Sequence, residues 1–212
     1  MSESPPDPMD PLALVPVVPV VVIERLADAV PVARALAAGG LPVVELTLRT
    51  PVALEAIAAI SAEVPDVVVG AGTITAPAQA QEAVDAGARF LVSPGATPRL
   101  LAGMHATGAP FLPGTATVSE VLAVLETGQQ AMKFFPAELS GGTGYLRAVG
   151  SVAPQARFCP TGGITPATAA DYLALPNVGC VGGSWLTPAP LVAAADWAGI
   201  TDLARAAASL RS

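Results

Sequence analysis

Runs of hydrophobic residues recur along the chain, and segments rich in helix-forming residues separate them. The runs begin roughly 20 to 26 residues apart, the length of one strand plus one helix with short loops. They cover Val17–Ile23, Val43–Leu48, Asp66–Thr73, Phe90–Pro94, Phe111–Gly114, Ala131–Phe135, Arg157–Thr161 and Val178–Gly182. Eight such units predict an α/β fold, a single-domain (β/α)8 TIM barrel. A doubly wound open sheet is the alternative, because spacing alone does not show that a sheet closes.

Local signals predict where the intervening helices begin and end. Residues 28–38 favour a helix that stops at Gly39-Gly40, a typical C-terminal cap. Thr50-Pro51 and Thr165-Pro166 each place a capping residue before a proline at the first helical position. We therefore expect helices to start at these two prolines. Further helices are expected over 76–86, 100–106 and 118–125, and a closing helix over 193–210.

The N-terminus has a different composition from the rest of the chain. Residues 2–11 carry four prolines and show no periodicity. We predict an N-terminal arm over residues 1–14 and a barrel domain over 15–212. The opening residues contain no basic segment, so no secretory signal is expected. The longest apolar run, residues 15–23, is too short for a membrane-spanning helix.

Composition narrows the class of protein further. Hydrophobic residues make up 52% of the chain and charged residues 13%, which indicates a large core or an oligomer interface. The net charge is −7 and basic residues do not cluster, so nucleic acid is not an expected partner. Cys159 and Cys180 lie in apolar runs without metal-ligand spacing, as expected of reduced thiols in a cytoplasmic protein.

Lys133 is the most informative single residue, since it is the only lysine among ten basic residues. It lies in an apolar strand with no adjacent carboxylate, and strand alternation places it on the same face as Phe135. If that face points into the barrel, burial disfavours the ammonium and favours the neutral amine that attacks carbonyls. A lysine that reaches out to the barrel rim is the alternative.

Glu45, Thr47 and Arg49 share one face of the second strand, because strand residues two apart point the same way. A carboxylate in the same interior as Lys133 could transfer protons or could serve only as its ion-pair partner. Arg49, near the end of the strand, has the planar fork that binds a carboxylate or phosphate. A surface arginine is the alternative.

Glycines follow the last two strands. The segments are Thr161-Gly162-Gly163 and Gly182-Gly183-Ser184. Glycine lets backbone N–H groups approach an anion, and barrels often bind phosphate at this pair of loops. The coincidence favours a phosphate site, although glycine pairs in short turns are also common for steric reasons. The only histidine, His105, is expected at the surface, and no residues have metal-ligand spacing.

The motifs together resemble one known family, the class I 2-keto-3-deoxy-6-phosphogluconate (KDPG) aldolases, also called 2-keto-4-hydroxyglutarate (KHG) aldolases. The resemblance covers roughly residues 15–205 and is most specific in Lys133-Phe-Phe-Pro-Ala-Glu138 and Arg157-Phe-Cys-Pro-Thr-Gly-Gly163. It implies a barrel, a homotrimer and a metal-free, cofactor-free enzyme that releases pyruvate from a 2-keto sugar acid. One departure is the proline-rich N-terminus, where the family usually begins with a helix.

The resemblance also implies residue roles. Lys133 forms the Schiff base and Glu45 is the general acid and base. Arg49 and Thr73 hold the pyruvate carboxylate, while Thr161 influences the stereochemistry of the new carbon centre. Gly162, Gly163 and Ser184 lie at the phosphate end. Three alternatives are an aldolase for the 6-phosphogalactonate epimer, a phosphosugar isomerase or epimerase barrel and a catalytically silent binding barrel.

Overall fold

Every predicted hydrophobic run overlaps a strand in the computed structural model, which describes residues 11–211. The strands are β1 (Val17–Val21), β2 (Val43–Thr47), β3 (Val68–Gly72), β4 (Leu91–Val92), β5 (Phe111–Leu112), β6 (Gly114–Thr115), β7 (Ala131–Phe134), β8 (Arg157–Pro160) and β9 (Val181–Gly183). All pair in parallel, and residues on both faces of β1 and β2 are buried. Burial on both faces explains why β1 is apolar throughout, whereas β2 also buries the polar Glu45 and Thr47.

The strands close into a ring. One sheet has the order β5-β4-β3-β2-β1-β9 and the other the order β6-β7-β8. Pro113 alone separates β5 from β6, so they are two parts of one chain run. On the other side, parallel bridges Phe158–Val178 and Thr161–Gly182 join the β8 segment to the β9 segment. The closed barrel is the predicted fold and excludes the open-sheet alternative.

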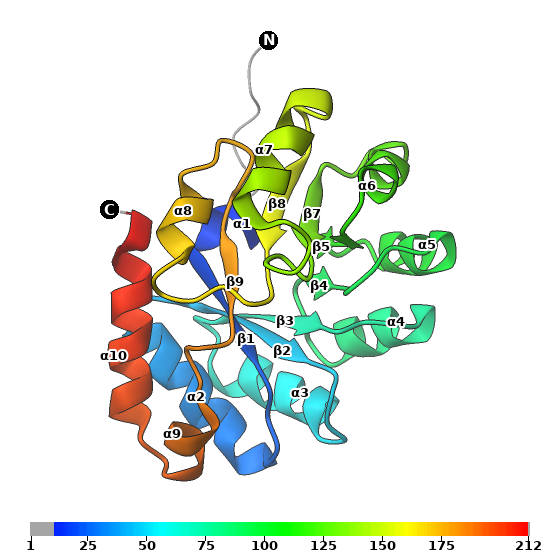
Figure 1. The fold of residues 1–212 in the computed structure, drawn as a ribbon. Coiled ribbons are helices and arrows are strands. Elements are labelled where there is room, and N and C mark those ends of the chain that lie inside the picture. Colours follow the sequence, from blue (N-terminus) through cyan, green and yellow to red (C-terminus); the bar gives the residue numbers. More distant parts are fainter. Residues whose placement is uncertain (1–10, 212) are drawn as a thin grey trace.

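Helices surround the strands, as Figure 1 shows. They are α1 (Pro11–Leu14), α2 (Leu26–Ala38), α3 (Ala53–Glu63), α4 (Pro77–Asp85), α5 (Pro98–Ala106), α6 (Val118–Leu125), α7 (Gly142–Val152), α8 (Ala169–Leu173), α9 (Ala189–Ala193) and α10 (Trp197–Ala208), followed by the 3-10 turn η1 (Ser209–Arg211). Most of the predicted arm, residues 1–10, lies outside the described residues. Its last four residues form α1, and the buried Leu12 packs against Gly179.

Three helix predictions were wrong in detail. Thr50 does not cap a helix; its hydroxyl donates to the carbonyl of Ile23, and α3 begins at Ala53. Thr165 closes a turn in which the N–H groups of Thr168 and Ala169 donate to its carbonyl, so α8 begins only at Ala169. In both cases the threonine makes its hydrogen bonds within the loop and does not cap the first turn of the helix. The closing helix, expected over residues 193–210, is shorter: α9 ends at Ala193, α10 begins only at Trp197, and the 3-10 turn η1 follows α10.

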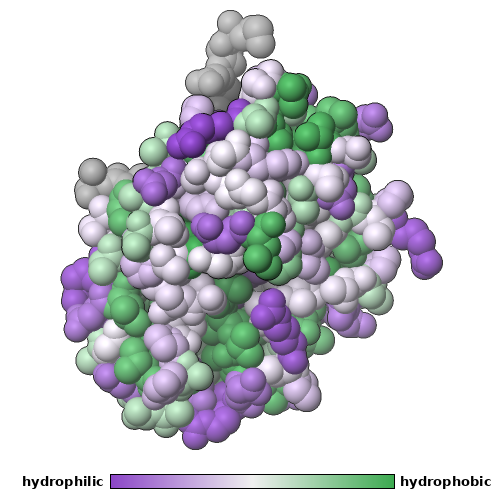
Figure 2. All heavy atoms as spheres, in the orientation of Figure 1, coloured by the Kyte–Doolittle hydropathy of each residue, from purple (hydrophilic) through white to green (hydrophobic). Residues whose placement is uncertain are grey.

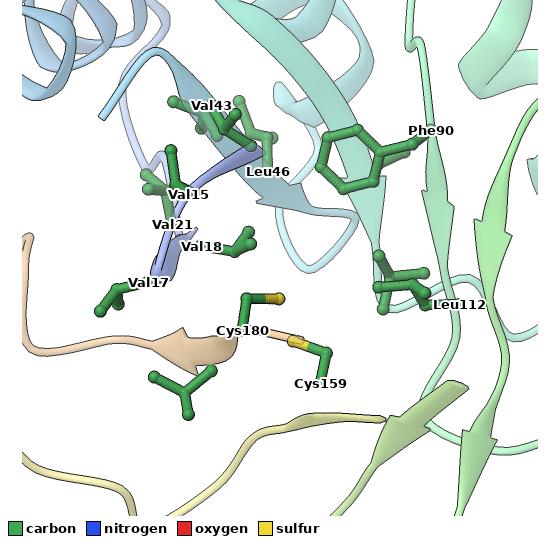
Figure 3. Packing of buried hydrophobic residues seen from close by; sticks show 14 of the residues in the cluster. Val15, Val17, Val18, Val21, Val43, Leu46, Phe90, Leu112, Cys159 and Cys180 are labelled. Carbon is green, nitrogen blue, oxygen red and sulfur yellow. The ribbon is translucent and has the colours of Figure 1, made fainter. Parts of the chain in front are cut away.

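The core joins the strands to each other and to the helices. Figure 3 shows Val17, Val18 and Val21 of β1 beside Cys180, whose sulfur lies on the side of Cys159. Phe90 lies directly over Gly70, where a Cβ would be 2.3 Å from the phenyl ring. The absence of a side chain at Gly70 in β3 therefore leaves room for the Phe90 ring.

Hydrophobic residues also remain at the surface. On the face drawn in Figure 2 they are interspersed with hydrophilic ones. The most exposed large examples are Leu139, Val152 and Leu122. Within residues 11–211, none of the helices has the length and apolar character needed to span a bilayer.

Candidate active site

The only lysine lies inside the barrel and forms an ion pair with the carboxylate predicted to share that interior. Nζ of Lys133 donates to Oε1 of Glu45 at 3.2 Å, and 88 residues separate them in the chain. Lys133 is 5% exposed and Glu45 is 2% exposed. The amine is therefore not at the rim, and its ammonium lies 5.3 Å from the centre of the Phe135 ring. Such a paired, enclosed amine beside a proton acceptor is a geometry suited to nucleophilic chemistry.

Strand register explains this meeting. Lys133 pairs with Gly114 on one side and with Cys159 on the other, while Glu45 pairs with Val20 and Gly70. The two residues belong to strands on different parts of the ring, so their side chains meet across the interior. Thr47, two residues after Glu45, is fully buried, and its hydroxyl donates to the carbonyl of Val21. Thr47 thus links β2 to β1 beside the pair.

Gly72 is a functional position that the sequence did not reveal. A Cβ at this position would lie 2.2 Å from Oε1 of Glu45 and 2.7 Å from its Cγ. Only a residue without a side chain leaves that volume to the carboxylate. The segment Gly70-Ala-Gly72 marks a close approach, but the sequence does not say which side chain fills the space.

Arg49 and Thr73 come together beyond the ends of β2 and β3. Nε of Arg49 donates to the hydroxyl of Thr73 at 3.3 Å. Arg49 is exposed in the turn that follows β2, whereas Lys133 and Glu45 are buried within strands. Thr73 has φ 61°, a left-handed conformation that is rare for a β-branched residue. Such backbone strain is characteristic of functional positions.

The two glycine-rich loops are neighbours, as predicted. Thr161 bridges to Gly182, and a Cβ at Gly182 would lie 2.2 Å from the Thr161 hydroxyl oxygen. Thr161 is buried, whereas Ser184 is exposed directly after β9. Gly162 and Gly163 have φ 101° and 80°, conformations that favour glycine. Ser184 also borders a largely apolar hollow of about 390 Å³ with Val20 and Val192.

The remaining candidates lie elsewhere. His105 is exposed near the end of α5, where its ring contacts Phe111 edge-on at 4.7 Å. Its predicted surface position is confirmed. In the part of the chain that the structure describes, His, Cys, Asp and Glu side chains form no group of three or more that could hold a metal ion.

Comparison with known proteins agrees with this geometry. A family model described as "Aldolase: KDPG and KHG aldolase" matches residues 10–203. The KHG/KDPG aldolase of Escherichia coli K12 is 52% identical over 187 residues, 88% of each chain.

Two solved structures are also similar. A KDPG aldolase from Legionella pneumophila, with pyruvate captured as a covalent carbinolamine intermediate, has a TM-score of 0.93 and 47% identity, and the match covers 96% of this chain and 98% of that one. The KDPG aldolase of Zymomonas mobilis ZM4 with 3-phosphoglycerate has a TM-score of 0.89 and 51% identity, with 94% and 93% covered. A barrel with an enclosed lysine–glutamate pair and this degree of similarity lead to one assignment: the chain belongs to the KDPG and KHG aldolase family, whose members are class I aldolases that break a carbon–carbon bond in a keto acid.

Proposed function

We propose that this enzyme cleaves KDPG to pyruvate and glyceraldehyde 3-phosphate through a Schiff base on Lys133, and that it also cleaves KHG to pyruvate and glyoxylate. The observation that carries the proposal is the enclosed ion pair of Lys133 and Glu45 at 3.2 Å. The carbinolamine captured in the Legionella pneumophila relative supports an amine nucleophile.

The first half of the reaction forms the electron sink. Once its ammonium has lost a proton, Lys133 attacks the C2 carbonyl of the substrate, and the carbinolamine loses water to give a protonated iminium. The ion pair places Glu45 within reach of Lys133 Nζ, so the carboxylate can accept a proton there. Arg49 and Thr73 bind the carboxylate of the keto acid, since their hydrogen-bonded pair combines a cation with a hydroxyl donor.

The second half breaks the carbon–carbon bond. Glu45, directly or through a water, takes the proton of the C4 hydroxyl as the C3–C4 electrons move into the iminium. The aldehyde departs and an enamine remains. Protonation of C3 and hydrolysis of the resulting pyruvate iminium then release pyruvate and regenerate the amine. Thr161, a buried residue directly after β8, influences the stereochemistry at C4.

The phosphate of KDPG binds at Gly162, Gly163 and Ser184. The 3-phosphoglycerate in the Zymomonas mobilis structure supports a phosphate end in this fold. A substrate epimeric at C4, the 6-phosphogalactonate derivative, remains the alternative within the same chemistry.

Borohydride trapping tests the proposal. With pyruvate and borohydride, wild-type protein should gain the mass of one reduced pyruvate adduct on Lys133, and Lys133→Ala should gain none and lose turnover. Labelling at another amine with activity intact in Lys133→Ala would refute the nucleophile. An isomerase or epimerase barrel would form no reducible adduct.

Ser184→Ala tests the phosphate end. A hydrogen bond to a charged acceptor contributes about 1.5–3 kcal/mol, so kcat/KM for KDPG should fall roughly ten- to a hundredfold. The value for KHG, which has no phosphate, should change little. An unchanged ratio of the two constants would mean that this serine does not bind the phosphate.

We also propose that the enzyme is a homotrimer and works in the cytoplasm. Leu139 is 90% exposed and Val152 is 63% exposed, and burial of such residues between subunits would stabilise an oligomer. The buried thiols Cys159 and Cys180 suit a reducing compartment. A mass in solution of three times 21.1 kDa would support the trimer, and a monomer mass would contradict it.

A further inference from the structure

Glu138, at the end of the KFFPAE segment, contacts both the glycine loop after β8 and helix α8. Its N–H donates to the carbonyl of Gly162 at 3.1 Å, next to the bond from Ala137 N–H to the carbonyl of Thr161 at 2.8 Å. The loop that follows β7 is thus joined through its backbone to the loop that follows β8. The mechanism above uses neither the side chain of Glu138 nor its partner.

The side chain of Glu138 lies against Gly163. A Cβ at Gly163 would be 2.7 Å from Cγ of Glu138 and 2.8 Å from its Cβ. Any side chain at position 163 would therefore collide with Glu138. The φ of Gly163 is 80°, a backbone conformation that residues other than glycine rarely adopt. Glu138 thus limits how far this turn can move.

A buried tyrosine holds the carboxylate in place. The hydroxyl of Tyr172, on α8, donates to Oε1 of Glu138 at 2.8 Å. Tyr172 is 1% exposed, and burial together with the neighbouring Glu138 carboxylate raises its pKa. The phenol consequently stays a proton donor throughout the pH range in which the enzyme can be assayed. A rigid aromatic side chain in the core therefore fixes the position of an otherwise exposed carboxylate.

Attraction to the substrate does not explain why the negatively charged Glu138 lies beside these glycines. Gly162 and Gly163 are where we place the phosphate of the substrate, and a carboxylate beside a phosphate repels it. The contacts of Glu138 are instead those of a support, with one bond to the loop backbone, one apolar contact with Gly163 and one bond from the core.

We propose that Glu138, held by Tyr172, is a positioning residue that orients the Gly162–Gly163 peptides for the phosphate group of the substrate. This inference rests on the proposed function, because it assumes that these glycines form the phosphate end. It predicts that the Glu138–Tyr172 bond sets the preference for phosphorylated over unphosphorylated substrates.

The experiment compares kcat/KM for KDPG and KHG in wild type and four variants. Glu138→Ala and Tyr172→Phe should each lower the KDPG-to-KHG ratio by about tenfold, because peptides that bind only the phosphate lose their support. Glu138→Gln retains an oxygen that accepts from Tyr172 and should keep the ratio within about threefold of wild type. Asp171 is an exposed carboxylate on α8 next to the same tyrosine. Asp171→Asn is therefore the matched control and should leave the ratio unchanged.

Each outcome decides the matter. If both constants fall together in Glu138→Ala and in Tyr172→Phe, the pair only stabilises the fold and the inference is wrong. A loss in Glu138→Gln as large as in Glu138→Ala would show that the charge acts, which also overturns positioning. Ser184→Ala separates the two proposals. A lowered ratio in that variant alone overturns only the role of Glu138, whereas an unchanged ratio in Ser184→Ala, Glu138→Ala and Tyr172→Phe overturns the phosphate end itself.

Discussion

The carboxylate of Glu45 occupies the space beside Gly72 that a side chain at position 72 would fill, with only 2.2 Å between Oε1 and the position of a Cβ. The ion pair of Lys133 and Glu45 thus depends on a missing side chain on the neighbouring strand. The orientation of the acid is set by what surrounds it as much as by the bond to Lys133.

Gly72→Ala should therefore damage catalysis although it replaces no reacting group. The methyl displaces the carboxylate from Lys133, and turnover should fall about 10²-fold, the scale of a positioned acid or base. Steady-state kinetics on KDPG measure the effect. Gly144→Ala is the control and should retain wild-type activity, because a Cβ there meets no atom of the described part of the chain within 4 Å. Wild-type turnover in Gly72→Ala would show that Glu45 tolerates displacement.

Glu45→Gln distinguishes an acid–base role from simple pairing. The amide keeps the size of the side chain but cannot take a proton, so turnover should fall about 10²-fold or more. Trapping of pyruvate on Lys133 with borohydride should persist in part. Near wild-type turnover would reduce Glu45 to an ion-pair partner of Lys133.

Thr73→Gly should affect stability and binding in different directions. The left-handed backbone of Thr73 costs about 1–3 kcal/mol, and glycine relieves it at an entropic cost of about 0.5–1 kcal/mol. We expect the free energy of unfolding to stay equal or rise by about 1 kcal/mol. KM should rise at the same time, because Arg49 loses its hydroxyl partner. Urea denaturation and kinetics measure both; a clear loss of stability would argue against strain.

Tyr145→Phe should leave the protein as stable as wild type or make it more stable. The hydroxyl of Tyr145 is buried and has no hydrogen-bond partner among residues 11–211, while its ring stacks on Phe134 with centroids 5.0 Å apart. Removal of an unsatisfied hydroxyl relieves a penalty of about 1–3 kcal/mol and keeps the stacking. Tyr172→Phe, which removes a bonded hydroxyl, should lower the melting temperature instead. The prediction fails if both variants lose similar stability.

Glu120→Gln tests a pH-dependent helix cap. Partial burial works to raise the pKa of Glu120, but hydrogen bonds from the N–H groups of Ala116 and Thr117 and from the Thr117 hydroxyl outweigh it, so the pKa lies below its ordinary 4.5. A depressed pKa in the folded state stabilises the protein above the unfolded-state pKa, and this contribution is lost as pH falls through the folded-state value. The exposed site limits the effect to about 0.5 kcal/mol.

The measurement is the difference in unfolding free energy between wild type and Glu120→Gln from pH 7 down to pH 3. That difference should be constant near neutrality and shrink in the acid region. A difference that does not vary with pH would show that the ionised cap contributes nothing beyond its geometry.

Local sequence determined much of this protein. Strands buried on both faces are mostly apolar, so each hydrophobic run predicted a strand, and period two placed the exceptional Glu45 on one face of β2 together with Thr47. A single lysine in such a strand indicated the nucleophile, and the KFFPAE and RFCPTGG motifs indicated the family. The helix expected over residues 118–125 also forms, and Thr117 and Glu120 make a capping box at its start.

Tertiary structure decided which of these residues meet. Alternation tells which face a side chain occupies, but only closure of the ring brings Glu45 within 3.2 Å of a lysine 88 residues away. Helix α7 was not predicted, because the glycines at 141, 142 and 144 disfavour a helix. It begins where Gly142 packs against Tyr172 of α8. Thr50 had the sequence features of a cap, yet its hydroxyl donates to the carbonyl of Ile23, in the segment that follows β1. Long-range contacts such as the bond from Tyr172 to Glu138 depend on the paths of distant segments in space, and no local pattern encodes them.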